Sequence, residues 1–327
     1  MTDLAPEPIM VDELHKFIFE GLPVRGMLVR LRPSWQALQA ARAEPYAAPV
    51  RALLGQMCAA GVLMRANIKF DGALVLQVFG DGPVKLAVAE VRDGLQFRAT
   101  AKVVGATADT DRLAALVNVH GQGRCAITLD PLERSRGQQP YQGVVALHGD
   151  QREPLQRISE VLEHYMLQSE QLDTRLLLAA DEHSAAGLLI QRLPGEGAGR
   201  HGADESRIGR DEGFNRIALL AATLTDDELL TLDSDRLLHR LFWQERLTRF
   251  APDPALVPRF ACSCSRERVS VMLQGLGCAE IESIVAERGD VEIGCEFCGR
   301  QYHFDAVDAA GLFTPGRDQP PAVGTVQ

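Results

Sequence analysis

The alternation of apolar and polar residues predicts that an early part of the chain forms an antiparallel sheet. Within residues 68–149, short alternating runs are separated by turn signals such as Asp71-Gly72 and Asp93-Gly94. Asp-Gly between alternating runs is a leading signal for a β-hairpin, so these runs predict a meander of neighbouring strands. Residues 21–31 alternate in the same way and predict an earlier strand, and residues 1–20 predict a mobile arm that leads into it.

Apolar residues at helical spacing predict the other elements. Residues 45–67 predict one long helix, and residues 155–166 predict an amphipathic one. Three shorter helices follow: one over residues 207–224, one that begins at the Thr225-Asp-Asp-Glu228 capping box, and one capped by Ser234. The two periodicities together predict an α+β fold, in which an N-terminal core of antiparallel sheet and helices is followed by a helical linker.

Four of the seven cysteines lie near the C-terminus. Cys262 and Cys264 form a Cys-x-Cys pair, and Cys295 and Cys298 form a Cys-x-x-Cys pair further along. The Cys-x-x-Cys spacing lets two thiolates from one tight turn bind one metal ion, and the first pair supplies two more ligands. The four cysteines therefore predict a closed tetrahedral site that holds one Zn²⁺ per chain.

A small scaffold is predicted around these cysteines. Ser265 is placed to cap a helix over residues 266–275, and Gly289 is placed to end a second short helix in a left-handed conformation. Residues 291–293 and 300–304 predict short strands on either side of the Cys-x-x-Cys pair. Such a module has little core, whereas structural zinc contributes about 10 to 16 kcal/mol of apparent folding free energy. Loss of the metal is therefore expected to unfold the module.

Composition narrows the classes of function. The chain of 327 residues carries a net charge of −10, which argues against sequence-independent binding of nucleic acid, because that needs a basic face. The chain has no apolar run long enough to span a bilayer, and its acidic start differs from a signal peptide. We therefore expect a cytoplasmic protein with no membrane partner. Clustered cysteines in that reducing compartment are more often metal ligands or redox-active thiols than permanent disulfides.

Signatures of an enzyme are missing from the sequence. None of the four lysines follows a glycine-rich phosphate loop, which excludes a P-loop ATPase. Neither a Ser-His-Asp arrangement nor a motif of paired carboxylates can be placed, and the eight histidines have no metal-ligand spacing. The chain is therefore not expected to be an enzyme.

Changes in composition mark the expected domain boundaries. Residues 194–203 are rich in glycine and predict a flexible loop, and residues 314–327 lack periodicity and predict a disordered tail. The expected division is a core domain (1–195), a flexible loop with a helical linker (196–257), a zinc-binding domain (258–313) and the tail (314–327).

Two separate stretches carry the sequence signatures of one known family. Residues 262–268 and 294–304 combine a Cys-x-Cys pair with a distant Cys-x-x-Cys pair, where ordinary zinc ribbons use Cys-x-x-Cys twice. In the N-terminal part the matching signatures are Val24-Arg25-Gly26, Lys69-x-Asp71-Gly72 and Tyr141-Gln142-Gly143-Val144. With both stretches, the chain resembles the redox-regulated heat-shock chaperonin family of thirty-three kilodaltons over most of its length.

The resemblance implies a function for the zinc centre. It implies an ATP-independent holdase that binds unfolding client proteins, works as a homodimer when oxidised and hands clients to ATP-dependent chaperones. It also implies that oxidation joins Cys262 to Cys264 and Cys295 to Cys298 and releases zinc. Zinc keeps these thiols deprotonated, so peroxide or hypochlorous acid can oxidise them through sulfenic acid to disulfides.

The helical linker is the expected place for client binding. Short isolated helices are marginal in water, so unfolding of the zinc module removes part of the support for the linker. The leucines expected to become exposed and to bind clients are Leu219, Leu220, Leu229, Leu230, Leu237 and Leu241. The alternative is that each of these leucines belongs to a core in every state.

Two other classes of function remain open. A thiol-disulfide oxidoreductase could use Cys295 and Cys298 as its dithiol, although its motif is expected to open a helix rather than follow a strand. A constitutive zinc module could bind another protein with an affinity that is indifferent to peroxide. Cys278, between the cysteine pairs, is either a neutral residue at a helix start or a rival disulfide partner. Cys58 and Cys125 are interpreted as small core residues.

Overall fold

The computed structural model describes residues 11–132, 139–194 and 211–313, and these residues fall into two compact units. The first unit ends at Ala261, and the second begins at Cys262. The first ten residues of the predicted arm, nearly all of the predicted glycine-rich loop and the predicted disordered tail lie outside the described residues. All four clustered cysteines belong to the second unit, and the finer division into four parts stays a prediction.

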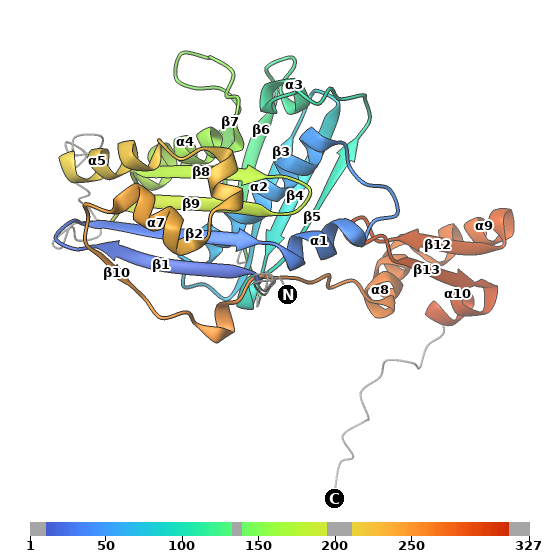
Figure 1. The fold of residues 1–327 in the computed structure, drawn as a ribbon. Coiled ribbons are helices and arrows are strands. Elements are labelled where there is room, and N and C mark those ends of the chain that lie inside the picture. The colour runs from blue at the N-terminus through green and yellow to red at the C-terminus, as the bar shows by residue number, and fades with distance from the viewer. Residues whose placement is uncertain (1–10, 133–138, 195–210, 314–327) are drawn as a thin grey trace, which may run out of the picture. The chain divides into compact units, whose positions relative to one another are not determined.

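An antiparallel sheet of five described strands forms one layer of the first unit (Figure 1). Its order is β10-β1-β2-β9-β8, so strands from distant parts of the sequence are neighbours. The strands are β1 (Glu13–Phe19), β2 (Val24–Leu31), β8 (Thr174–Ala180), β9 (Ala185–Arg192) and β10 (Leu247–Arg249). The expected mobile arm over residues 1–20 is wrong for β1, because this strand pairs with β2 and buries Phe17 and Phe19.

A second sheet contains the predicted meander. Its described strands have the order β11-β5-β4-β3-β6-β7, and only β11 runs parallel to its neighbour. The strands are β3 (Gly72–Phe79), β4 (Val84–Val91), β5 (Gln96–Val103), β6 (Arg124–Pro131), β7 (Tyr141–Ala146) and β11 (Arg259–Phe260). The hairpin predicted at Asp93-Gly94 is confirmed between β4 and β5, where Gly94 has a φ of +63° that suits glycine.

The helix α2 (Ala48–Arg65) packs against strands of both sheets and fills the core of the first unit. Most of its 18 residues are buried, so it is apolar on nearly all sides rather than along one stripe. A Cβ atom at Gly55 would lie 2.5 Å from the Cβ atom of Ala180, so this glycine allows the close approach to β8. The other helical segments of this core are α1 (Pro33–Ala40), α3 (Leu113–Val117), α4 (Ile158–Glu170) and the short 3-10 turns η1 (Asp93–Leu95) and η3 (Pro254–Leu256).

Three short helices, which we call the linker helices, lie over the first sheet (Figure 1). They are α5 (Glu212–Ala221), α6 (Asp226–Thr231) and α7 (Ser234–Phe242). The sheet residues buried beneath them, which we call the covered sheet face, are Phe17, Phe19, Val24, Leu28, Ala179, Ala186, Leu188 and Ile190. Helices of this length are marginal alone, so the linker helices depend on this contact.

The caps of the first two linker helices are side chains. The capping box predicted at Thr225 is confirmed: its hydroxyl accepts from the amide of Glu228, and the Glu228 carboxylate accepts from the amide of Thr225. The helix predicted over residues 207–224 is shorter, because Asp211 caps α5 by accepting from the amide of Phe214. Residues 207–210 lie outside the described residues.

The cap of α7 differs from the prediction. Asp233 rather than Ser234 caps the helix, because its carboxylate accepts from the amide of Arg236 at 2.9 Å. Ser234 is buried, and its hydroxyl donates to the carboxylate of Glu13 at 2.8 Å. The serine therefore joins α7 to β1, a tertiary contact that the local sequence does not reveal.

The second unit is a small α+β module. A hairpin of β12 (Asp290–Gly294) and β13 (Gln301–Asp305) packs with α8 (Arg266–Leu276), α9 (Cys278–Arg288) and α10 (Ala306–Leu312). The predicted caps are confirmed: Ser265 accepts from the amide of Arg268, and Gly289 ends α9 with a φ of +91°. The strands predicted around the Cys-x-x-Cys pair are confirmed as well.

No single described helix is both long and apolar enough to cross a bilayer. Among the described helices, only α8 and α9 taken together have the length and composition of a membrane span, and a bend of 105° separates them.

Candidate metal centre

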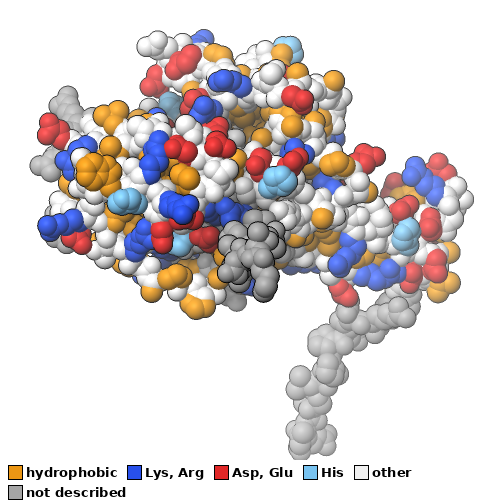
Figure 2. Space-filling view, viewed as in Figure 1, with side chains coloured by type: hydrophobic (Ala, Val, Ile, Leu, Met, Phe, Trp, Pro, Cys, Tyr) orange, Lys and Arg blue, Asp and Glu red, His pale blue; other side chains and the backbone are white. Residues whose placement is uncertain are grey.

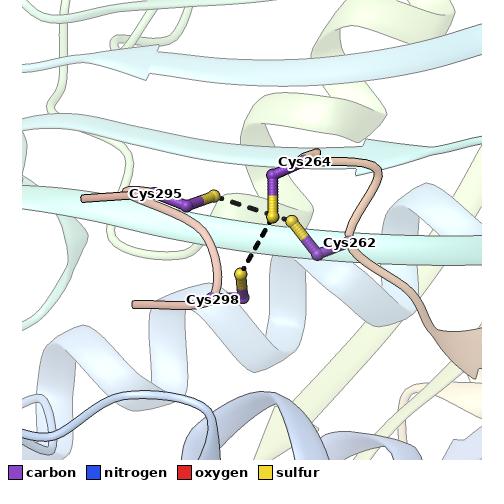
Figure 3. Close-up of side chains that lie close together, drawn as sticks. All are labelled: Cys262, Cys264, Cys295 and Cys298. Carbon is purple, nitrogen blue, oxygen red and sulfur yellow. Dashed lines mark hydrogen bonds between the residues drawn. The ribbon is translucent and has the colours of Figure 1, made fainter. Parts of the chain in front are cut away.

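Four cysteine side chains of the second unit point toward one centre (Figure 3). Cys262 and Cys264 lie in the segment before α8, and Cys295 and Cys298 lie in the turn between β12 and β13. The Cys-x-x-Cys motif thus follows a strand and does not open a helix, which argues against the oxidoreductase alternative.

The turn that carries the second pair is closed by main-chain hydrogen bonds. The amide of Cys295 donates to the carbonyl of Arg300 at 2.9 Å, and the amide of Gly299 donates to the carbonyl of Cys295 at 2.8 Å. Gly299 has a φ of +68°, which a side chain would oppose. The hairpin therefore presents both sulfurs on the same side of one tight turn.

The sulfur atoms are spaced as a tetrahedral metal site requires. The Sγ atoms of Cys262 and Cys295 lie 3.6 Å apart, those of Cys264 and Cys298 lie 3.4 Å apart, and all four fall within 4.8 Å of one another. Four sulfurs at about 2.3 Å from one zinc ion would be separated by about 3.8 Å. All four cysteines are partly buried and none forms a disulfide. The residues present fit a closed site of four thiolates.

The thiols of this cluster titrate differently from free cysteine. Burial alone would raise the pKa of Cys264, but interactions with Tyr302 and the neighbouring thiols outweigh it and lower this pKa to about 7. Burial, followed by the neighbouring thiols, raises the pKa of Cys298 to about 12, and burial raises that of Cys295 as well. Without a metal ion, protonated thiols therefore share the cluster at neutral pH, and a divalent cation has to displace their protons.

The core that supports this site is small. Within the described part of the second unit, residues 262–313, the buried core residues are Leu273, Ile281, Val291, Tyr302, Phe304 and Ala309. Outside this core, Arg266 stacks over the Phe304 ring at 4.1 Å and pairs with Asp308 at 2.6 Å, but exposed ion pairs add little stability. A core of this size is too small to keep the second unit folded without a cross-link such as a bound metal ion.

The three other cysteines do not belong to the cluster. Cys58 and Cys125 are fully buried in the core of the first unit, where burial raises the pKa of each thiol, so both are the core residues that the sequence predicts. Cys278 is exposed at the start of α9, and its hydrogen bond with Glu282 raises its pKa. The position at a helix start matches the neutral interpretation of Cys278.

The six candidate client-binding leucines differ in their surroundings. Leu229, Leu237 and Leu241 are buried against the covered sheet face, and Leu220 and Leu230 pack partly against it. Leu219 points away and is 71% exposed. Undocking of the linker helices would therefore uncover five of the six, whereas Leu219 is already accessible. Their role in client binding stays a prediction.

The covered sheet face is the feature that sequence reasoning missed. Phe17 and Phe19 come from β1, which the sequence assigns to a mobile arm, and Phe19 packs edge-on against Phe242 of α7 with ring centroids 5.1 Å apart. The run Phe17-Ile18-Phe19, which is aromatic and β-branched as strands favour, is the signal that could have revealed the strand.

The visible surface has no single-sign charge field. On the face shown in Figure 2, acidic and basic side chains are interspersed over the first unit.

Comparison with known proteins gives one consistent family. The model of the Hsp33 protein family matches residues 12–305. The chain is 45% identical to the 33 kDa chaperonin of Chromobacterium violaceum over 92% of this chain and 94% of the relative. It is 42% identical to the 33 kDa chaperonin of Nitrosococcus oceani over 93% of this chain and 94% of the relative.

A solved structure shares the fold. The crystal structure of the 33 kDa chaperonin, a heat shock protein 33 homologue, from Thermotoga maritima matches 91% of this chain and 97% of its own. The TM-score is 0.69 at 19% sequence identity, which confirms the predicted α+β fold. The family match, the relatives and this fold agree, and the chain belongs to the Hsp33 protein family of chaperones.

Proposed function

We propose that this chaperone is an ATP-independent holdase that oxidation switches on. The observation that carries the proposal is the gathering of four cysteines from two distant motifs in a unit with a very small core of its own. A change in these four thiols therefore decides whether the second unit stays folded.

The metal of the reduced form is proposed to be one Zn²⁺ per chain, held by Cys262, Cys264, Cys295 and Cys298. Four sulfur ligands in a closed tetrahedral arrangement are typical of structural zinc. Bound zinc supplies a cross-link that keeps the thiols ionised and holds the second unit folded. The four side chains contribute all of its ligands, so no open coordination position is left for a substrate.

The chemistry of the switch is proposed to be disulfide formation. One thiolate attacks an oxygen of hydrogen peroxide, the O–O bond breaks, hydroxide leaves and a sulfenic acid forms. A second thiolate attacks that sulfur, the S–S bond forms and a second hydroxide leaves. Two peroxide molecules thus take four electrons from four thiolates and leave two disulfides and no zinc ligands.

The proposed disulfides join Cys262 to Cys264 and Cys295 to Cys298, as the family resemblance implies. All four sulfurs lie within 4.8 Å, so distance in the reduced cluster does not choose among pairings. Cys278 is proposed to stay outside the exchange, because it is not in the cluster and its contact with Glu282 raises its pKa, which reduces its thiolate fraction.

The second unit is connected to the linker helices through a short connector. After α7 the chain forms β10, three residues at the edge of the first sheet, and β11, two residues at the edge of the second. Strands this short hold few hydrogen bonds. We infer that unfolding beyond Ala261 loosens the connector and then the linker helices, which uncovers the apolar residues of the covered sheet face for client binding.

The partners of the active form follow from this surface. An apolar face that opens only after oxidation suits unfolding proteins that expose apolar segments of their own. We propose that the oxidised protein works as a homodimer in the cytoplasm and passes its clients to ATP-dependent chaperones. No reaction is catalysed in this scheme, so the protein is proposed to act as a binding protein rather than as an enzyme.

The test follows zinc, thiols and chaperone action in the same samples. Reduced protein is treated with peroxide at raised temperature, and released zinc, free thiols and light scattering by an aggregating test protein are measured together. The proposal predicts that about one zinc leaves as four thiols disappear and that protection appears at that point. Zinc that stays bound, or zinc loss without protection, contradicts the proposal and favours a constitutive zinc module.

A further inference from the structure

The hydroxyl of Tyr302 is buried beside the cysteine cluster. Tyr302 lies on β13 opposite Ile293 of β12, and 7% of its surface is exposed. Its side chain belongs to the core cluster against which Cys264 and Cys295 pack. The hydroxyl oxygen is buried, and no hydrogen bond of ordinary geometry satisfies it among the described residues. A buried hydroxyl in native proteins is normally hydrogen-bonded, so this one needs a partner.

The sulfur of Cys264 is the acceptor that faces this hydroxyl. Cys264 packs against the small core to which the Tyr302 ring belongs, and the side chains of Tyr302 and Cys264 interact directly. A phenol hydroxyl donates and a thiolate only accepts, so Tyr302 is the donor of this pair. The side chain of Arg300 contacts the same hydroxyl.

The sulfurs of Cys295 and Cys298 accept hydrogen bonds from the main chain. The amides of Phe297 and Cys298 donate to the Cys295 sulfur, and the amide of Arg300 donates to the Cys298 sulfur. These amides are fixed by the turn and are present whatever the side chains are. Tyr302 differs because its donor belongs to a side chain and is removed by one substitution.

We propose that Tyr302 is a positioning residue of the metal centre, whose hydroxyl donates a hydrogen bond to the Cys264 thiolate and slows its oxidation. The inference rests on the proposed zinc site. Four thiolates around one divalent cation leave an excess negative charge on the sulfurs. A charge-assisted hydrogen bond withdraws electron density from the sulfur that accepts it, so the sulfur attacks peroxide more slowly. Partners of this kind also strengthen metal binding.

The test replaces Tyr302 by phenylalanine in the full-length, zinc-loaded protein. Tyr302→Phe keeps the ring in the core and removes the donor. We expect zinc affinity, measured by competition with a chelator, to fall about 10- to 100-fold. We expect peroxide to oxidise the thiols and release zinc several-fold faster. In the cobalt-loaded protein, the sulfur-to-cobalt absorption bands are expected to shift, a change that loss of packing alone does not produce.

The matched control is the next residue on the same strand. His303 is exposed on the opposite side of β13, so His303→Gln should leave affinity, rate and spectrum unchanged. Site-specific replacement of Tyr302 by a fluorotyrosine, which is a stronger donor of similar size, should change the oxidation rate in the opposite direction. This second variant keeps the test valid if the phenylalanine variant folds poorly.

The outcomes separate this inference from the proposed function. If the wild-type protein binds no zinc, the proposed function fails. If the wild-type protein binds zinc and is switched by peroxide, but Tyr302→Phe matches it in affinity, oxidation rate and cobalt spectrum, the role of Tyr302 is overturned. If both tyrosine variants change the oxidation rate in the expected opposite directions, the hydrogen bond is established as a brake on the switch.

Discussion

Arg30 on β2 donates a hydrogen bond from its Nη2 atom to the main-chain carbonyl of Leu229 on α6, at 3.0 Å. This carbonyl belongs to the last turn of α6, where the helix itself offers no donor. Only 1% of Arg30 is exposed, and its Nε and Nη1 atoms have no hydrogen-bond partner among the described residues. The contact between the sheet and the linker helices therefore contains a buried cation that is poorly satisfied.

Replacing this cation tests whether it keeps docking of the linker helices weak. In Arg30→Met, the Leu229 carbonyl loses its donor, which costs about 1 to 3 kcal/mol. Removal of a buried, poorly paired charge stabilises docking by a similar or larger free energy. We predict that docking is unchanged or stabilised by up to about 2 kcal/mol, measured by amide hydrogen exchange of residues 212–242, and that more peroxide or heat is needed for activation.

The control for this variant is Arg32→Met. Arg32 is partly exposed, and its Nη2 atom lies 3.4 Å from the carbonyl of Leu230, so its removal should change docking by less than about 0.5 kcal/mol. Faster exchange of the linker helices in Arg30→Met would contradict the interpretation, because it would mean that the guanidinium is a net stabiliser.

Two leucines of the linker helices offer a matched pair. Leu237 is 0% exposed in the contact with the sheet, and Leu219 is 71% exposed. Leu237→Ala should destabilise docking by about 2 to 5 kcal/mol, whereas Leu219→Ala should change it by less than about 0.5 kcal/mol. We therefore expect the reduced, zinc-loaded Leu237→Ala protein to suppress aggregation of a test protein without oxidant. Equal inactivity of both reduced variants would argue against the covered sheet face as the client-binding surface.

Glu13 makes docking of α7 depend on pH. Its carboxylate accepts from Ser234 and lies 2.7 Å from Nε2 of His15. The hydrogen bond with His15, opposed by burial and aided by Ser234, lowers the pKa of Glu13 from 4.5 to about 2. A carboxyl whose pKa is lower in the folded state stabilises the fold above its unfolded pKa. That contribution is lost as the pH falls from about 4.5 toward 2.

The size of this effect can be measured with one variant. A shift from 4.5 to about 2 corresponds to roughly 3 kcal/mol, and solvent screening at this partly exposed group reduces it to about 1 to 2 kcal/mol. As the pH falls from about 5 to about 2, the linker helices of Glu13→Gln should therefore lose less protection from hydrogen exchange than those of the wild type. Glu212→Gln on the exposed side of α5 is the control and should follow the wild type.

Removal of the metal under reducing conditions should unfold the second unit and leave the core of the first unit folded. Its small core cannot replace about 10 to 16 kcal/mol of apparent stabilisation by zinc. We expect a chelator to collapse the NMR dispersion of amides in α8, α9, β12 and β13, while amides of α2 stay protected, and zinc to restore the spectrum. A dispersed spectrum of the metal-free, reduced second unit would show that the metal is not needed for its fold.

Zinc binding should weaken as the pH falls. The pKa of Cys298 is raised to about 12 and that of Cys295 is also raised, so both thiols are protonated at neutral pH without the metal. If binding displaces these two protons, the apparent affinity falls about 100-fold for each pH unit above about pH 7, and more steeply below it, where the Cys264 thiol with its pKa of about 7 is protonated as well. Chelator competition from about pH 6 to about pH 8 measures how the affinity changes with pH. A slope near zero would contradict the claim that thiols of the metal-free cluster are protonated at neutral pH.

Local chemistry explains which parts of the structure were predictable. Cys295 and Cys298 could be assigned because the spacing of a metal knuckle is set within one turn. The same is true of the turn at Gly94 and of the cap at Ser265, where the side chain and its partner are a few residues apart. Such features depend on neighbours in the sequence, so the sequence alone reveals them.

Long-range contacts explain the rest. Phe19 meets Phe242 only because β1 and α7 fold onto each other, and nothing near either residue indicates the partner. Ser234 looks like a helix cap in the sequence, but its hydroxyl donates a hydrogen bond to Glu13, which is distant in the sequence. Tyr302 reaches Cys264 because of the register of β12 and β13, which fixes the face on which its ring lies. These contacts depend on the assembled fold.

Hydrogen exchange before and after oxidation shows whether the linker helices leave the sheet. Loss of the four thiols is proposed to loosen these helices and to uncover the sheet beneath them. Peroxide treatment should remove protection from residues 212–242 and from the second unit, while the amides of α2 stay protected. If zinc is lost and the second unit opens, but residues 212–242 exchange as slowly as in the reduced protein, the proposed uncovering of the sheet is contradicted.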